Sequence, residues 1–217
     1  MNYFAEISVR YNPEISREQV RNTLFGKLHI ALADLRNGPS KDARFERIGV
    51  SFPDVTPSPL RHLELTDGNA ATGGRKPTSR LGYRLRLHSE QDDPLEALLK
   101  HNRLSVMRDY VDISDIQETP TSLKGHCCVK RVQAKSGVER LRKRRVTRHD
   151  IGYAEAIEQI PDDASELLSL PFIQMTSAST KQPRFRLFID HGPLVDDAVP
   201  GTFNTYGLSS EATIPWF

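Results

Sequence analysis

The order of apolar patterns along the first 116 residues restricts the fold more than any other feature. Four short segments are typical of strands: residues 3–9, 47–52, 81–88 and 111–116. Ser16 can cap a helix whose apolar face is formed by Val20, Leu24, Leu28, Ala31 and Leu35. Asp92 can cap a second helix that carries Leu95, Leu98, Leu99, Leu104 and Met107. The order strand-helix-strand-strand-helix-strand predicts a ferredoxin-like (RRM-like) unit, in which two helices cover one face of a four-stranded antiparallel sheet.

The composition of the chain changes near Thr121, which predicts a second domain. We therefore expect an α+β protein with a ferredoxin-like domain at 1–120 and a second α+β domain at 121–217. The second domain is expected to contain a basic helix at about 137–149, a short helix at 153–159 and a hairpin of strands 172–177 and 184–190. A last strand is expected near 203–206, and residues 53–79 read as a long surface loop.

Positive charge is concentrated in one segment, residues 130–149. Nine Lys or Arg residues against one acid give this segment +8, whereas the whole chain is only +2. A polyanion, above all a nucleic acid, is the natural partner of such a segment, because each neutralised phosphate releases counterions. Basic runs also form the solvated faces of ordinary helices, and charge alone does not choose between the two readings.

The spacing within this segment favours an anchored helix with one cationic face. Ser136 and Glu139 form a capping-box pattern at its start. At 100° per residue, a single face collects Arg140, Lys143, Arg144 and Arg148, with Thr147 near its middle.

Composition and motifs exclude several other classes of protein. The chain is 37% apolar and 27% charged, as expected of a globular protein, and no stretch approaches the length of a membrane span. The N-terminus lacks a signal-peptide pattern, so we expect a cytoplasmic protein without a membrane partner. The two cysteines are adjacent, and none of the seven histidines has metal-ligand spacing. We therefore expect neither a metal nor a cofactor.

Three residues outside the basic helix are candidates for chemistry or base reading. His29 lies at the edge of the apolar stripe of the first helix, where it can face a groove or be a boundary histidine without a role. Arg131 and Gln133 point to the same side of an extended segment. Arg suits guanine and Gln suits adenine, but ordinary polar strand residues have the same spacing.

A series of short motifs in register resembles the CRISPR type I-F repeat-processing endoribonuclease, which is also the crRNA-bound subunit of the type I-F surveillance complex. The matching blocks are FGKLH (25–29), RIGVSFPD (47–54), RVQAKS (131–136), ERLR (139–142), RHD (148–150), LPF (170–172), FRLFI (185–189), HGPL (191–194), YGLS (206–209) and PWF (215–217). Residues 37–45 and 56–79 fall outside the resemblance and read as insertions.

The resemblance implies a metal-independent cut at the 3′ base of a repeat hairpin, with the product kept bound. The 2′-OH attacks the adjacent phosphorus and leaves a 2′,3′-cyclic phosphate and a 5′-OH. By this match, His29 is the general base, Ser177 holds the 2′-OH in line, and Tyr206 orients His29 or the phosphate.

The resemblance also implies two kinds of partner, which are the CRISPR repeat RNA hairpin and the other subunits of the type I-F surveillance complex. It further indicates which residues bind the RNA. Base reading falls to Arg131 and Gln133, and stacking on the last base pair to Phe185. In the domain at 121–217, which the resemblance makes the RNA-binding domain, Arg144 and Arg148 match arginines of the family's major-groove helix. Arg140 and Lys143 share their face by helical spacing, and the other RNA-binding positions are Lys135 and Ser179. The chain departs from the family pattern at Thr147, where arginine is expected, and in a turn between Ser177 and Phe185 that is one residue longer.

Two other functions compete with this one. A structural RNA-hairpin-binding subunit of a ribonucleoprotein would bind without cutting, and the joint presence of His29, Ser177 and Tyr206 argues against it. A DNA-binding basic helix would bind duplex DNA as tightly as RNA.

Overall fold

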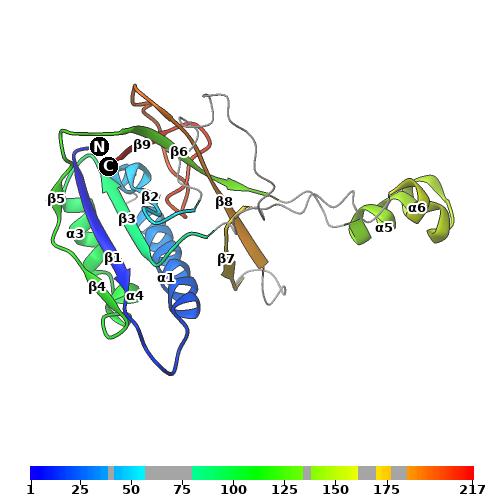
Figure 1. The fold of residues 1–217 in the computed structure, drawn as a ribbon, viewed down its shortest axis with the longest axis horizontal. Coiled ribbons are helices and arrows are strands. Elements are labelled where there is room, and N and C mark those ends of the chain that lie inside the picture. Colours follow the sequence, from blue (N-terminus) through cyan, green and yellow to red (C-terminus); the bar gives the residue numbers. More distant parts are fainter. Residues whose placement is uncertain (39–41, 57–79, 134–137, 161–169, 177–184) are drawn as a thin grey trace, which may run out of the picture. The chain divides into compact units, whose positions relative to one another are not determined.

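Two antiparallel sheets and their helices make up the computed structural model of the chain, which is an α+β protein (Figure 1). The structure describes residues 1–38, 42–56, 80–133, 138–160, 170–176 and 185–217. It divides into two compact units, one of residues 1–131 with 170–217 and one of residues 132–169. This division differs from the expected boundary after residue 120.

The first sheet contains strands β1 (Tyr3–Val9), β2 (Gly49–Ser51), β3 (Arg84–Ser89) and β4 (Val111–Ile113) in the order β2-β3-β1-β4. A two-residue strand, β5 (Gln117–Glu118), also pairs with β1. All of these pairings are antiparallel. From Ala5 to Val9, successive β1 residues alternate between buried and half-buried positions, as expected of a sheet with one face against the core.

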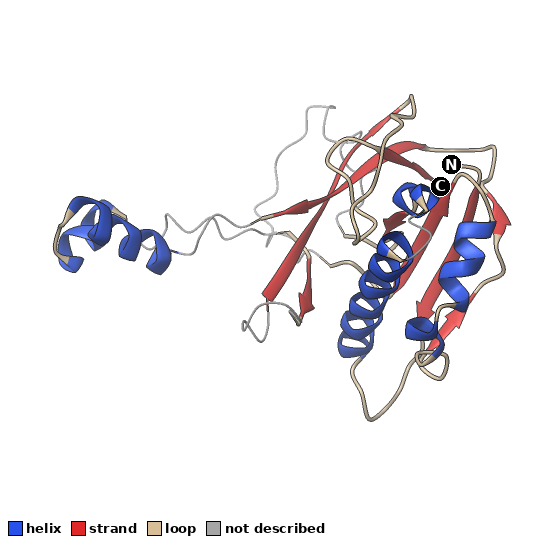
Figure 2. Cartoon of the chain, turned by 180° about the vertical axis from the view of Figure 1, so that it is seen from behind, coloured by secondary structure: helices blue, strands red, loops and turns tan. Residues whose placement is uncertain are grey.

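Helices α1 (Arg17–Asn37), α3 (Asp93–Lys100) and α4 (Asn102–Ser105) cover one face of this sheet (Figure 2). The predicted caps of α1 and α3 are confirmed: the Ser16 hydroxyl accepts from the Gln19 amide, and the Asp92 carboxylate accepts from the Asp93 amide. The second predicted helix is interrupted at His101, which lies between α3 and α4 and caps the start of α4. A short 3₁₀ helix, η1 (Ala43–Arg47), precedes β2, so the second strand is shorter than expected.

The second sheet has the order β7-β8-β6-β9, with β6 at Gly125–Val132, β7 at Phe172–Met175, β8 at Phe185–Val195 and β9 at Thr213–Trp216. The expected hairpin is confirmed, since β7 pairs with β8 from Phe172↔Phe188 to Met175↔Phe185. The prediction of a strand near 203–206 is wrong. There the Asn204 side chain accepts from the amides of Tyr206 and Leu208 and stabilises a turn.

One hydrophobic core joins the two sheets. It includes Ile7 and Leu28 from the first sheet and its helix, and Cys127, Ile189 and Ile214 from the second sheet. Because these side chains bury one another, strands β6 to β9 belong with the first 120 residues, and the expected boundary does not separate two cores.

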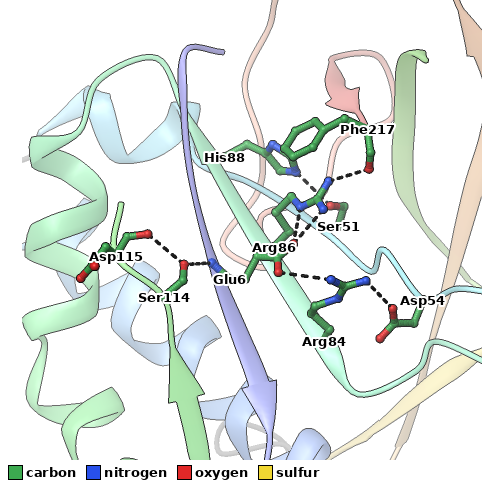
Figure 3. A network of polar contacts seen from close by, with 9 residues as sticks. All are labelled: Glu6, Ser51, Asp54, Arg84, Arg86, His88, Ser114, Asp115 and Phe217. Atoms are coloured by element: carbon green, nitrogen blue, oxygen red, sulfur yellow. Dashed lines mark hydrogen bonds and ion pairs between the residues drawn. The ribbon is translucent and has the colours of Figure 1, made fainter. Parts of the chain in front are cut away.

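A polar network ties the last residue of the chain to the first sheet (Figure 3). Arg86 donates to Glu6 at 2.8 Å and to the Phe217 carbonyl at 3.1 Å, and its guanidinium carbon lies 3.8 Å from the centre of the Phe217 ring. The fully buried His88 ring shares a 2.9 Å hydrogen bond with the Ser51 hydroxyl. The network therefore connects strands β1, β2 and β3 with one another and with Phe217.

The unit of residues 132–169 contains α5 (Val138–His149) and α6 (Tyr153–Gln159), both at the expected positions. Arg142 is buried and donates from Nε to the Ile160 carbonyl at 2.8 Å, while Arg145 donates to the Gln159 side chain at 2.9 Å. Two of the arginines of α5 therefore hold α6. The expected cap Ser136 lies outside the described residues.

Candidate active site

His29 lines a cavity of about 540 Å³ between α1, the end of β7, the start of β8 and the turn after residue 204. The cavity is also lined by Phe185 and Tyr206, so the structure brings three of the predicted site residues together. The side chain of His29 is half-buried, which fits the predicted position at the edge of the apolar stripe, next to the fully buried Leu28.

The hydrogen bond of His29 determines which ring nitrogen can act as a base. Nδ1 of His29 lies 3.0 Å from the carbonyl oxygen of Thr205. Because a carbonyl oxygen only accepts, Nδ1 must carry the proton and donate it. Nε2 of the neutral ring then has its lone pair available to accept a proton.

The surroundings of His29 keep it neutral. Burial lowers the pKa of His29, and the positive charge of Arg131 lowers it further, against the raising effect of the Thr205 carbonyl. A histidine with a lowered pKa is largely deprotonated at neutral pH. His29 is thus in the state that proton abstraction requires.

Tyr206 stacks on His29, with ring centres 4.0 Å apart and planes 13° from parallel. Its turn is anchored at Gly207, which has a φ of +71° and whose carbonyl accepts from the Val50 amide at 2.8 Å. A Cβ at Gly207 would lie 2.2 Å from Cγ2 of Val50. The turn therefore approaches β2 as closely as only glycine allows, and this holds Tyr206 and the Thr205 carbonyl beside α1.

Arg131 reaches the same cluster from β6. Its guanidinium carbon lies 5.6 Å from the centre of the Tyr206 ring, in the range of a cation–π contact, and its side chain is exposed. Gln133 is exposed and belongs to the other compact unit. The expected orientation of Arg131 and Gln133 to the same side therefore stays a prediction. Ser177 and Ser179 lie outside the described residues. Thr176, the residue before Ser177, lines the cavity.

The basic face of α5 is exposed at Lys143, Arg144 and Arg148, which border a shallow hollow together with Thr147. The Thr147 hydroxyl donates to the Lys143 carbonyl at 2.9 Å, so this side chain bonds to its own helix. Lys135 and the side chain of Arg140 lie outside the described residues.

Sequence reasoning missed several residues of the His29 cavity. Lys27 and Gln174 line it, and Lys27 supplies an ammonium group. At 100° per residue, Lys27 and His29 lie far apart around α1, so the helical period does not group them. No pattern predicted that β7 would lie along α1. A larger cavity of about 730 Å³ lies beside β4, but no histidine lines it.

The described residues contain neither a candidate metal site nor a candidate membrane-spanning helix. They hold no group of three His, Cys, Asp or Glu side chains placed to bind a metal ion. Within the same ranges, no helix has the length and apolar character needed to cross a membrane.

Residues 4–217 match the family model described as CRISPR-associated protein (Cas_Csy4). Two relatives named CRISPR-associated endonuclease Cas6/Csy4, from Pseudomonas aeruginosa and Escherichia coli, are 41% and 37% identical over 100% of both chains. A solved structure described as a RAMP protein binding different RNA substrates covers 99% of each chain at 12% identity, with a TM-score of 0.34 that is too low to support an argument.

Proposed function

The chain belongs to the Cas_Csy4 family of CRISPR-associated proteins, and from this premise we propose that it is a metal-independent endoribonuclease that cleaves the CRISPR repeat hairpin. The family resemblance inferred from the motifs is thereby confirmed, as is kinship with CRISPR-associated endonucleases. The cut falls at the 3′ base of the hairpin, and the protein keeps the product. One observation carries the proposal: His29 is held neutral, donates from Nδ1 to Thr205 and lines a cavity with Tyr206.

In the proposed reaction His29 Nε2 takes the proton of the ribose 2′-OH. The 2′ oxygen attacks the adjacent phosphorus and the bond from phosphorus to the 5′ oxygen breaks. The products are a 2′,3′-cyclic phosphate and, after the leaving oxygen takes up a proton, a 5′-OH. A base of this kind typically contributes about 10²–10⁴-fold to the rate. Since the nucleophile belongs to the RNA, the protein needs no nucleophile of its own.

The other roles near the cut are those of positioning and charge. Tyr206 keeps the ring of His29 in place by stacking, and Ser177 holds the 2′-OH in line. We add Lys27 to the predicted residues, because an ammonium group in this cavity can neutralise the phosphate as negative charge develops on its oxygens.

The proposed RNA contacts divide between the two compact units. In the first, Arg131 reads a purine beside the cut and Phe185, which lines the His29 cavity, stacks on the last base pair. In the second, Gln133 reads a neighbouring purine and the exposed cationic face of α5 binds the phosphates of the stem. Arg140 is proposed from its place on the predicted cationic face, and Lys135 and Ser179 are proposed from the family resemblance alone.

The strand order supports a ferredoxin-like fold for the first sheet, and the family membership supports the proposed protein partners. The strand order β2-β3-β1-β4, with α1 and α3 on one face, favours a ferredoxin-like arrangement for the first sheet. Membership of the CRISPR-associated family supports the other subunits of the type I-F surveillance complex as partners.

The test is cleavage of a repeat hairpin by the purified protein in excess EDTA. We expect a product with a cyclic phosphate, and no cleavage when the scissile nucleotide carries deoxyribose. His29→Ala should lower the single-turnover rate by about 10²-fold or more while the affinity for the hairpin stays nearly the same. His126→Ala is a matched control, because Nδ1 of His126 also lies 3.0 Å from a backbone carbonyl, that of Asp196, but His126 does not line the cavity.

Three results would contradict the proposal. Cleavage that requires added Mg²⁺ would exclude the base mechanism. Binding without any cleavage would indicate a structural RNA-binding subunit. Equal affinity for duplex DNA of the same sequence, measured by competition, would indicate a DNA-binding helix instead.

A further inference from the structure

A second cavity, of about 470 Å³, opens beside the first turn of α1. Glu18 and Arg21 of α1 line it together with Arg80, Tyr83 and Phe172, the first residue of β7. Its volume lies within the range of small-ligand pockets. The proposed reaction at His29 uses none of these residues.

Aromatic rings and arginines dominate the walls of this cavity. The Tyr83 side chain is 41% exposed, and the guanidinium carbon of Arg17 lies 5.2 Å from its ring centre. Phe172 has Arg186 in the same relation, at 4.7 Å. Exposed aromatic faces beside guanidinium groups are the means by which proteins bind the bases of single-stranded RNA.

The wall that carries Tyr83 is fixed in place by Arg21. This arginine is only 6% exposed, and its Nη1 donates to the Gly82 carbonyl at 3.1 Å. Gly82 has a φ of +75°, and a Cβ at this position would lie 2.3 Å from Cβ of Asp54. Because the backbone next to Tyr83 is held from both sides, the ring is presented before any ligand arrives.

Two elements connect this cavity with the cavity of His29. α1 contributes Arg21 to one and His29 to the other, about 12 Å apart along the helix at 1.5 Å per residue. β7, which lies along α1 (Figure 1), contributes Phe172 to one and Met175 to the other, about 10 Å apart at 3.3 Å per residue. A strand of about three stacked nucleotides, at 3.4 Å each, spans this distance.

We propose that this cavity binds an unpaired nucleobase of the RNA strand that continues past the cleaved bond, an inference that rests on the proposed function. Past the base of a hairpin the strand is single, so its base faces and edges are open to stacking. Tyr83 stacks on the base, and Arg17 and Arg80 neutralise the neighbouring phosphates. The Glu18 carboxylate, which only accepts hydrogen bonds, selects bases with an exocyclic amino group over uracil.

The experiment compares hairpin RNAs that carry deoxyribose at the scissile nucleotide and are therefore not cut. One RNA ends at the scissile phosphate and the other continues for three cytidines, a length matched to the spacing of about three stacked nucleotides. We expect the flank to tighten binding by wild-type protein between about 5-fold and 150-fold, the range of one base–aromatic stack. Tyr83→Ala should abolish this gain and leave the affinity for the RNA without a flank unchanged.

Two further variants and one control complete the design. Arg80→Ala should lower the salt slope of binding by about one for the flanked RNA only. Glu18→Ala should remove the preference for cytidine over uridine in the flank. Tyr11→Ala, which changes a tyrosine that is 77% exposed and lines neither cavity, should retain the full gain.

The inference is overturned if the 3′ flank adds no affinity, if a 5′ flank of the same sequence adds as much, or if Tyr83→Ala weakens binding of both RNAs equally. Binding of the RNA without a flank and cleavage of an all-ribose hairpin test the proposed function separately. If both of these tests succeed and the flank experiment fails, only the proposed binding of a nucleobase in this cavity is rejected.

Discussion

The positive charge of Arg131 adjusts the pH at which His29 can act as a base. Burial lowers the pKa of His29 and the Arg131 guanidinium lowers it further. Replacing Arg131 by Gln removes the charge, so the pKa of His29 should rise. More of His29 is then protonated on the acid side, and the cleavage rate there should fall, while at alkaline pH the base is neutral in both proteins.

The size of this effect follows from two distances. The ring centre of His29 lies 4.0 Å and the Arg131 guanidinium carbon 5.6 Å from the centre of the Tyr206 ring, so the two are at most about 9.6 Å apart. At that separation unit charges repel by about 0.4 kcal/mol in a water-like dielectric of about 80, and by about 1.7 kcal/mol at about 20. The rate far down the acid limb should therefore fall by about 2-fold to 17-fold relative to the rate at alkaline pH.

The assay is single-turnover cleavage with saturating protein at low salt, where screening is weakest. The rate at about pH 5 is divided by the rate at about pH 8, so that any pH-independent loss of RNA positioning in the Arg131→Gln variant cancels. Arg131→Lys is the matched control, because it keeps the charge and should keep the wild-type ratio. A ratio for Arg131→Gln equal to or above that of the wild type would refute the assignment of His29 as the base that Arg131 influences.

Three further perturbations address other parts of the molecule. Arg144→Ala should weaken hairpin binding and lower its salt slope by about one unit, and an unchanged slope in a titration series would remove Arg144 from the phosphate contacts. Gly207→Ala should destabilise the fold by about 1–3 kcal/mol in urea unfolding, because alanine is strained at this φ and its Cβ meets Val50; cleavage should fall as Tyr206 shifts, and wild-type stability would contradict the tight approach. Burial lowers the pKa of His191 to about 3, so the unfolded state binds the extra proton and stability is lost as pH falls below about 6.5. His191→Phe should recover about 2 kcal/mol of that loss at about pH 5, measured by urea unfolding against the same variant at neutral pH, and an unchanged pH dependence would show that His191 does not titrate in this way.

Much of the first sheet could be predicted because its signals are local. The caps at Ser16 and Asp92 and the apolar stripe of α1 are formed by residues close together in the sequence. The second sheet was harder to predict. Strand β9 contains Pro215, which disfavours a central strand but is accommodated here because β9 lies at the edge of its sheet.

The turn at Asn204 shows why an apolar pattern can mislead. Phe203 and Tyr206 resemble strand residues, yet the Asn204 side chain offers the following amides a local partner that outcompetes strand pairing. His29 and Tyr206 could be identified from the sequence as candidate site residues. The hydrogen bond of His29 to the Thr205 carbonyl could not be predicted, because the two residues are 176 positions apart and no local pattern indicates such a partner.

The partner of His29 Nδ1 is a main-chain atom, and this has a consequence for how the site tolerates mutation. Every amino acid at position 205 carries the same carbonyl oxygen, so a change of a single codon there removes no acceptor. The ring orientation of His29 is vulnerable instead to changes in backbone path, such as an insertion or deletion between β8 and β9. Natural variation should therefore be freer in the side chain at position 205 than in the length of the loop that contains it.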